Sequence, residues 1–168
     1  NPYFFNVSQQ NDALHEAAGK TMQDKGFKRV ALIAPNYPAG KDSIAGFKRF
    51  YKGEIGMETY TALNQLDYGA ELSKMRAANV DGVYIFLPGG LGVNFIKQFV
   101  GAGLSKDMTL YAPGFSADED VIRAVGESML GTFNTSQWAH DLDNAANKKF
   151  VADFQKENPG IKIKPIYA

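Results

Sequence analysis

Short apolar runs alternate with loops containing glycine or proline and with amphipathic helical stretches along most of the chain. The clearest apolar runs are Arg29–Pro35, Val83–Leu87 and Thr109–Ala112. Strands that alternate with helices form a parallel sheet covered on both faces, and ligands bind outside the carboxyl ends of its strands. The pattern therefore predicts an α/β fold and a ligand edge built from three loops: Asn36–Asp42, Pro88–Gly92 and Pro113–Asp118.

The remaining elements follow from the spacing of apolar side chains. We expect a strand at Met57–Ala62, and strand or crossover segments at Tyr3–Val7 and Leu130–Ser136. Helices are expected from Asn11 or Asp12 to Lys25, from Asp42 through Tyr51, and at Gly69–Asn79, Val93–Val100, Glu119–Val125 and Asp141–Glu157. The inward residues of the first and last helices are expected to be Leu14, Ala17, Ala18, Thr21 and Met22, and Ala146, Phe150 and Phe154.

Composition narrows the possible partners. Lys plus Arg equals Asp plus Glu at 18 each among 168 residues, so the charge gives no reason to expect nucleic acid as a partner. The chain has no cysteine and only His15 and His140, which argues against a zinc site and against disulfides. The sequence shows no signal peptide and no apolar run of the length that a membrane helix needs. Its first and last residues lead us to expect a piece cut from a longer chain.

Two loops approach nucleotide-binding motifs and depart from them. Gly40-Lys41 follows a strand, but a phosphate loop needs glycine where Pro35 stands and Ser or Thr where Asp42 stands. The Gly90-Leu91-Gly92 turn begins like a dinucleotide fingerprint, but Phe95 replaces its last glycine, so we expect the helix to stand away from the strand. We therefore predict no nucleotide and no other cofactor.

A third loop, Gly114–Asp118, lies between a strand and a helix like a nucleophile elbow. The elbow's closing glycine is missing, and Asp118 would crowd the turn. Ser116 is therefore expected to act as a cap or a ligand contact, and we predict that the protein is not an enzyme. What remains at the ligand edge is an aromatic and amide surface suited to binding, although Tyr37 and Phe115 could also serve only to pack their loops. Its residues are Asn36, Tyr37, Phe86, Pro88, Gly89, Gly90, Phe115 and Ser116.

The chain resembles the periplasmic solute-binding proteins of the leucine/isoleucine/valine type, which feed ABC importers. The matching stretches follow the family's order over nearly the whole chain. They are Tyr3–Phe5, Lys28–Ile33, Gly40–Asp42, Gly46–Lys48, Asp67–Leu72, Asp81–Tyr84 and Leu130–Thr132. The resemblance implies one Rossmann-like lobe of a type I periplasmic binding protein, with helices on both faces of a parallel sheet.

Family members have two such lobes joined by three crossovers, with the ligand held in the cleft. The resemblance implies that residues 1–135 form the second lobe, and that residues 136–168 form a crossover and a helix belonging with the first lobe. It also implies a small-molecule solute, an ABC permease and the missing first lobe as partners, and a periplasmic or otherwise extracytoplasmic location. A lone lobe offers half a cleft, so we expect this chain alone to bind weakly or not at all.

The resemblance also bears on the ligand. Amino-acid binders of the family place an acidic residue where Gly114 stands, an aromatic residue where Pro88 stands and a tyrosine where Ala39 stands. Without an acid, a desolvated ammonium group lacks a charged partner, unless Asp118 substitutes for it. The loops resemble those of the family's branch that binds aromatic carboxylates. We therefore expect an aromatic or other small carboxylate, stacked on rings from Tyr37, Phe86, Phe115 and Trp138.

Three alternatives to transport remain open. A ligand-sensing domain of the same fold in a regulator or receptor would make the same contacts, and only flanking sequence would separate it from a transport protein. A Rossmann-type enzyme would show turnover that depends on a cofactor. A plain structural module would bind no small solute.

Overall fold

The computed structural model describes residues 2–5 and 12–164. Contacts divide the chain into two compact units, Asn1–Thr135 and Ser136–Ala168. The first unit contains a five-stranded, wholly parallel sheet of order β2-β1-β3-β4-β5. Its strands are β1 (Arg29–Pro35), β2 (Glu54–Thr61), β3 (Gly82–Ile85), β4 (Thr109–Pro113) and β5 (Phe133–Thr135).

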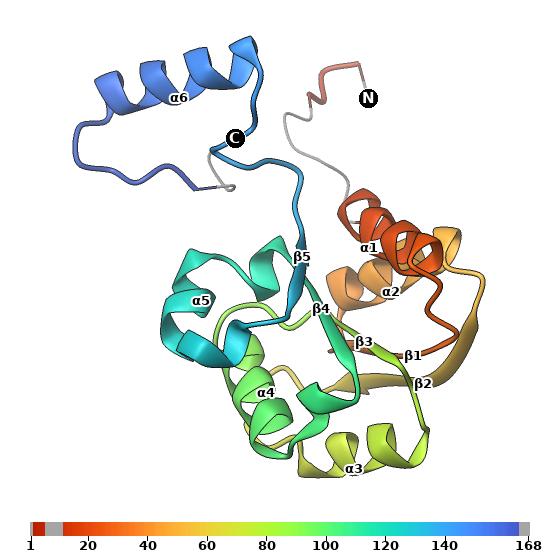
Figure 1. Ribbon diagram of the computed structural model, residues 1–168. Helices are drawn as coiled ribbons and strands as arrows, with labels where there is room; N and C mark the ends of the chain where they lie inside the picture. Colours follow the sequence, from red (N-terminus) through yellow and green to blue (C-terminus); the bar gives the residue numbers. More distant parts are fainter. Residues whose placement is uncertain (1, 6–11, 165–168) are drawn as a thin grey trace. The chain divides into compact units, whose positions relative to one another are not determined.

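Helices cover both faces of this sheet, as predicted. Figure 1 shows α1 (Ala13–Asp24) and α2 (Pro38–Phe50) on one face, and α3 (Gly69–Ala77), α4 (Gly90–Gly101) and α5 (Glu119–Val125) on the other. Three short 3-10 helices, Leu104–Lys106, Gly114–Ser116 and Gly126–Met129, complete the connections.

The central strands divide their side chains between two hydrophobic cores, because successive residues of a strand point to opposite faces. In β1, Ala31 and Ile33 enter the core beneath α3, α4 and α5, whereas Leu32 enters the core beneath α1 and α2. In β3, Ile85 and Tyr84 divide in the same way. Burial on both faces explains why these strands read as continuous apolar runs.

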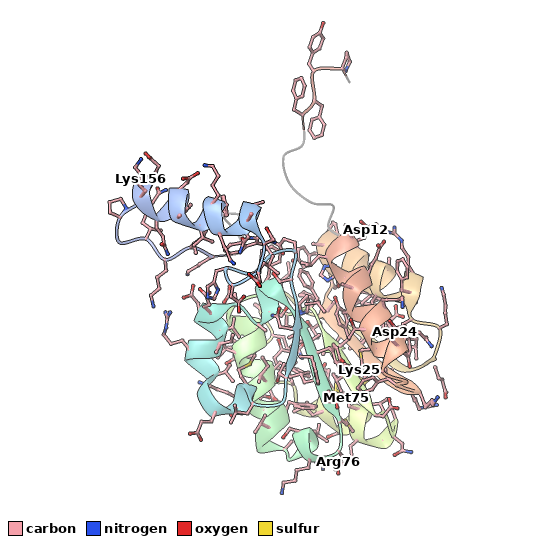
Figure 2. All side chains as sticks on the ribbon, turned by 45° about the horizontal axis from the view of Figure 1, so that its top comes forward. Asp12, Asp24, Lys25, Met75, Arg76 and Lys156 are labelled. Atoms are coloured by element: carbon pink, nitrogen blue, oxygen red, sulfur yellow. The ribbon has the colours of Figure 1, made fainter. Side chains whose placement is uncertain are left out.

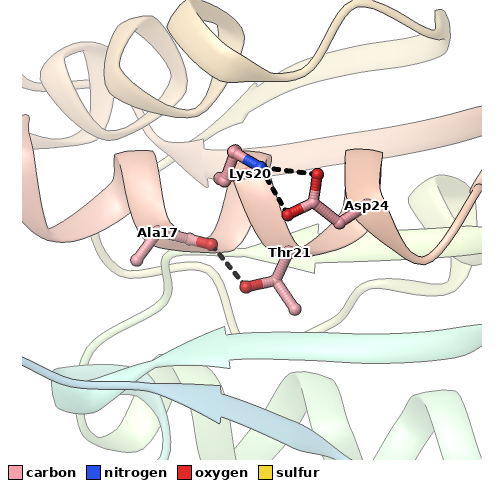
Figure 3. Close-up of polar contacts among 4 residues, drawn as sticks. All are labelled: Ala17, Lys20, Thr21 and Asp24. Atoms are coloured by element: carbon pink, nitrogen blue, oxygen red, sulfur yellow. Dashed lines mark hydrogen bonds and ion pairs between the residues drawn. The ribbon is translucent and has the colours of Figure 1, made fainter.

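The inward face of α1 is rotated from the predicted one. Leu14, Ala18 and Met22 are buried as expected, together with His15 and Gly19. Ala17 is exposed, and its carbonyl accepts a hydrogen bond of 2.7 Å from the Thr21 hydroxyl (Figure 3). Lys20 and Asp24 form an ion pair one turn apart on α1 (Figure 3). Figure 2 labels Asp24, the last residue of α1, and Asp12, which directly precedes the helix. Thr21, which was also predicted to face inward, is half-buried.

Three helices begin at residues other than the predicted ones. Helix α2 starts at Pro38, because Tyr37 is extended and proline suits the first helical position, so Asp42 lies inside the helix. Helix α4 starts at Gly90 instead of Val93. Helix α6 (Ala145–Glu157) starts four residues after Asp141, because the Asn144 side chain caps it.

Strand boundaries also differ from the predictions. β2 begins three residues before Met57, β3 ends before Phe86, and β5 is shorter than the predicted Leu130–Ser136. Tyr3 lies in a turn and Phe4 and Phe5 in irregular chain, while the rest of the predicted Tyr3–Val7 segment lies outside the described residues.

The second unit is organised around one buried asparagine. The side-chain amide of Asn147 donates to the carbonyls of Ala139, His140 and Leu142, and its oxygen accepts from the Trp138 indole at 2.6 Å. The Trp138 ring also packs edge-on against Phe150, at 5.9 Å between centroids. Phe150 is half-buried, but Ala146 is exposed, contrary to prediction, because Asn147 takes the inward position.

Helices α1 and α2 touch through backbone at two glycines. A Cβ atom on Gly46 would lie 2.1 Å from the carbonyl oxygen of Asp12, and one on Gly19 would lie 2.1 Å from that of Phe47. Arg49 reinforces the contact by pairing with Glu16 at 2.7 Å and with Asp12. These contacts fix how closely α1 can cover the sheet.

Gly46→Ala is expected to lower the free energy of unfolding by about 1–3 kcal/mol, because the added methyl group meets backbone that cannot yield without separating the helices. Gly101→Ala is the matched control, since a Cβ there meets nothing within 4 Å. Alanine at that helical position is expected to be neutral or to stabilise by up to about 1 kcal/mol. Urea unfolding followed by circular dichroism measures both, and equal effects of the two substitutions would contradict the packing argument.

Candidate ligand-binding edge

The three predicted loops meet at one edge of the sheet. β1, β3 and β4 are adjacent and parallel, so their carboxyl ends lie side by side. The Phe86 amide donates to the Ile33 carbonyl at 2.9 Å, which ties the loop after β3 to β1. On the other side, the Gly89 amide donates to the Phe115 carbonyl at 3.3 Å. We call this region the ligand edge, and all ten predicted site residues lie within it.

The ten residues differ in how accessible they are in this chain. Asn36, Gly89 and Gly90 are exposed, whereas Tyr37, Ala39, Pro88 and Phe115 are half-buried and Phe86, Gly114 and Ser116 are buried. Gly90 and Ala39 stand in the first turns of α4 and α2, and Phe115 lies in a 3-10 turn.

Ser116 holds two loops together. Its hydroxyl oxygen accepts a hydrogen bond of 2.8 Å from the Leu87 amide, and the residue is fully buried. Gly114–Ser116 forms a 3-10 turn, so the hydroxyl does not project from a sharp strand-to-helix turn as a nucleophile elbow requires. The Ser116 hydroxyl therefore ties the turn after β4 to the chain after β3.

Two aromatic rings form the apolar part of the edge. The rings of Tyr37 and Phe86 are stacked, with centroids 6.5 Å apart and planes inclined by 15°. Partial burial raises the pKa of the Tyr37 phenol, which keeps it neutral at physiological pH. A flat solute can add to such a stack at little entropic expense, because two-torsion aromatic side chains are already held in place.

His15 is a neighbour of this site that sequence reasoning missed. Its imidazole packs edge-on against Phe86, at 4.9 Å between centroids, and its Nδ1 lies 2.5 Å from the Tyr84 hydroxyl. Burial lowers the His15 pKa to about 4, although Asp12 and Asp42 oppose the shift. The available signal was Gly19, four residues on, since a glycine inside a helical pattern indicates close packing on that flank.

At Gly92 the first turn of α4 lies against the chain that directly follows β3, which corrects the expectation that this helix stands away. A Cβ there would lie 2.4 Å from the carbonyl oxygen of Leu87. Gly40 plays the same part after β1, where a Cβ would lie 2.0 Å from the Pro35 oxygen. Gly40 and Gly92 therefore allow the helices to pack closely. The other residues that the nucleotide motifs require are missing from both loops.

The carboxylate of Asp118 caps α5. Its Oδ1 accepts hydrogen bonds from the amides of Asp120 at 3.0 Å and Val121 at 2.9 Å. This capping draws the carboxylate towards the helix that it begins. In the described part of the chain, no group of three His, Asp or Glu residues is arranged to hold a metal ion. Across the same residues, every helix is too short or too polar to span a bilayer.

A model of the periplasmic binding protein family matches residues 1–167, and the chain belongs to this family. Leu/Ile/Val-binding protein homolog 6 of Brucella melitensis is 29% identical over 160 residues, which are 92% of this chain and 41% of that protein. The chain therefore spans less than half the length of this curated relative.

Solved structures of ABC transporter solute-binding proteins share the fold. One from R. palustris in complex with benzoate is 31% identical, with a TM-score of 0.83 over 98% of this chain and 45% of its own. Another from R. palustris, in complex with 4-hydroxybenzoate, is 27% identical, with a TM-score of 0.85 over 96% of this chain and 45% of its own. A substrate-binding protein from Sphaerobacter thermophilus is 25% identical and has a TM-score of 0.89, covering 99% and 47%.

These findings confirm the predicted family and the predicted type I periplasmic binding fold. The chain corresponds to less than half of each of these relatives. The contacts of individual site residues with a ligand, and the assignment of residues 136–168 to a first lobe, remain predictions.

Gly89 has a backbone conformation that favours glycine, with φ 58° and ψ −128°. A Cβ there meets nothing within 4 Å, so Gly89→Ala is expected to lower stability by about 1–3 kcal/mol through backbone strain alone. Gly90→Ala, at the next residue, also enters open space but in a helical conformation, and should be neutral or stabilising. Urea unfolding of the pair measures the difference, and a strain-free Gly89→Ala would refute it.

His15 is expected to make stability depend on pH. Its pKa is 6.5 when unfolded and about 4 when folded, so between these values the unfolded chain binds more protons. The free energy of unfolding is therefore unaffected by His15 titration above pH 6.5. It falls as the pH drops from 6.5 towards 4, by about 3 kcal/mol at most. Urea unfolding from neutral to acidic pH should give a flatter profile for His15→Phe than for the wild type. Parallel profiles would contradict the burial argument, because other titrating groups are common to both proteins.

Proposed function

We propose that this chain is the second lobe, with adjoining segments, of an extracytoplasmic solute-binding protein that delivers a small aromatic carboxylate to an ABC importer. The stacked pair of Tyr37 and Phe86 at the ligand edge is the observation that carries this proposal. Membership of the periplasmic binding protein family supports the transport role and the location outside the cytoplasm. The benzoate-bound relative from R. palustris supports an aromatic acid as the solute.

The loop after β4 lacks the acidic partner that an amino-acid ligand would need. Gly114 carries no side chain where the resemblance calls for an acid, and Asp118 is committed to capping α5. An ammonium group held there would lose its water without gaining a carboxylate partner. A ligand carboxylate can instead use main-chain amides at the start of α4, where Gly90 is exposed, although the Gly89 amide already donates to the Phe115 carbonyl.

The proposed mechanism is capture without chemical change. The solute lies on the aromatic pair of this lobe, the first lobe closes over it, and the closed form presents both lobes to a permease in the membrane. Closure follows binding only if the solute has higher affinity for the closed form than for the open one. The division of the chain at Thr135 supports residues 1–135 as the second lobe and 136–168 as a crossover and a helix that belong with the first.

The proposal predicts the ligand preference of the complete two-lobed protein. Benzoate or 4-hydroxybenzoate should raise its melting temperature, since a ligand at a hundred times its Kd stabilises the folded state by about 2.7 kcal/mol. Leucine at the same concentration should give a smaller shift. A response to leucine and other amino acids with none to aromatic acids would refute the ligand assignment.

The Tyr37 ring supplies a second test by calorimetry on the same protein. Tyr37→Ala should weaken benzoate binding about tenfold, through loss of ring contact, while Tyr37→Phe should retain most of the affinity. Phe50→Ala is the control, because Phe50 is an exposed aromatic residue at the far end of α2. Equal affinities for Tyr37→Ala and the control would remove Tyr37 from the site.

A further inference from the structure

His15 contacts Phe86 of the ligand edge, although it lies on α1, a helix that contributes no loop to that edge. α1 begins directly after residue 12 and covers the sheet face that contains Tyr84 and Phe86. The imidazole of His15 meets Phe86 at 4.9 Å between centroids and 70° between planes. Phe86 therefore lies between two rings, with His15 edge-on and Tyr37 in a stacked arrangement.

A buried hydrogen bond fixes the position of the imidazole. His15 is only 2% exposed, and its Nδ1 is 2.5 Å from the hydroxyl of Tyr84, which is fully buried. The Tyr84 ring packs against Phe47 of α2 at 4.6 Å between centroids. Burial raises the pKa of the Tyr84 phenol well above its ordinary value, so the partner of His15 stays neutral. His15 is thus anchored to the central strand as well as to its own helix.

The Phe86 ring needs this support, because its backbone does not fix the ring by itself. The amide of Phe86 bonds to Ile33, but the residue follows the last position of β3. The torsions of its side chain are therefore set by the groups that pack against it, which include the rings of His15 and Tyr37. Removing the imidazole would leave a space behind Phe86 into which the ring can turn, away from the stack.

We infer that His15 is a positioning residue of the ligand edge, which holds the Phe86 ring flat against Tyr37 for an aromatic solute. The role lies in the ring: the imidazole supplies an edge of the right size, and the hydrogen bond to Tyr84 keeps that edge in place. The effect on affinity rests on the proposed function, whereas the effect on the two rings can be measured without a ligand.

The binding test compares three variants of the complete two-lobed protein, titrated with benzoate by calorimetry. His15→Ala removes the ring and should weaken binding about three- to tenfold, the range that one aromatic contact represents. His15→Asn places an amide where Nδ1 lies, so it can keep the bond to Tyr84 without a ring, and it should be weakened similarly. The double variant His15→Phe with Tyr84→Phe keeps both rings and removes the two polar partners together, so it should recover most of the affinity.

Met22→Ala is the matched control for loss of stability. Met22 is as buried as His15 and lies on the same face of α1, but near Gly82, at the opposite end of β3. It should destabilise the fold by cavity formation and leave benzoate affinity unchanged. If Met22→Ala weakens binding as much as His15→Ala, the effect is general loosening and the inference is wrong. Full affinity in His15→Asn with poor affinity in the double variant would also overturn it.

A second measurement keeps this inference separate from the proposed function. In the 168-residue chain without ligand, nuclear Overhauser contacts between the Tyr37 and Phe86 rings should be clear in the wild type and in the double variant, and weak in His15→Ala. If aromatic acids fail to bind the wild type but these contacts change as stated, the function fails and the positioning role stands. Unchanged ring contacts in a folded His15→Ala protein would overturn the positioning role.

Discussion

Close approach between helix backbone and strand ends is the constraint on which the ligand edge depends. At Gly40, the helix lies against the last carbonyl of the preceding strand, and at Gly92 it lies against a carbonyl just after the strand. At neither glycine would a single methyl group fit. The chain therefore turns from strand to helix within a few residues, and the loops between them stay short. Short loops from three neighbouring strands leave little freedom to the backbone of Tyr37, Phe86 and Phe115. A rigid edge of this kind loses little entropy when a solute binds.

Buried polar side chains also stabilise the ligand edge. The Ser116 hydroxyl joins the loops after β3 and β4, and the pair of His15 and Tyr84 braces the core beneath Phe86. Each of these polar side chains is buried and has a partner, so each costs little in desolvation and restricts how the loops can move. The binding surface itself is left to aromatic rings and main-chain amides. Hydrogen-bonded polar side chains in the interior and an apolar surface at the edge suit a protein that binds a solute without altering it.

The sequence was sufficient to predict the parallel sheet, both helical layers and the loops that form the edge, because buried central strands give unbroken apolar runs. It was less informative about where helices begin. Pro38 and Asn144 determine two of these starts, and Asp42 and Asp141 are equally plausible caps when only local sequence is considered. The role of His15 was hidden because it depends on a contact with Tyr84, 69 residues away in sequence. The close approach of α4 at Gly92 was missed because the neighbour of Gly92 in space is a carbonyl, which no side-chain pattern reveals.

The bond between Trp138 and Asn147 has a spectroscopic consequence. Trp138 is the sole tryptophan of the chain, and its indole is held by Asn147 and Phe150 within residues 136–168. Indole emission from the isolated chain therefore reports the integrity of the smaller unit, whereas far-ultraviolet dichroism is dominated by the sheet and helices of the larger one. The two signals need not change at the same denaturant concentration, and their separation would measure how far the units unfold independently.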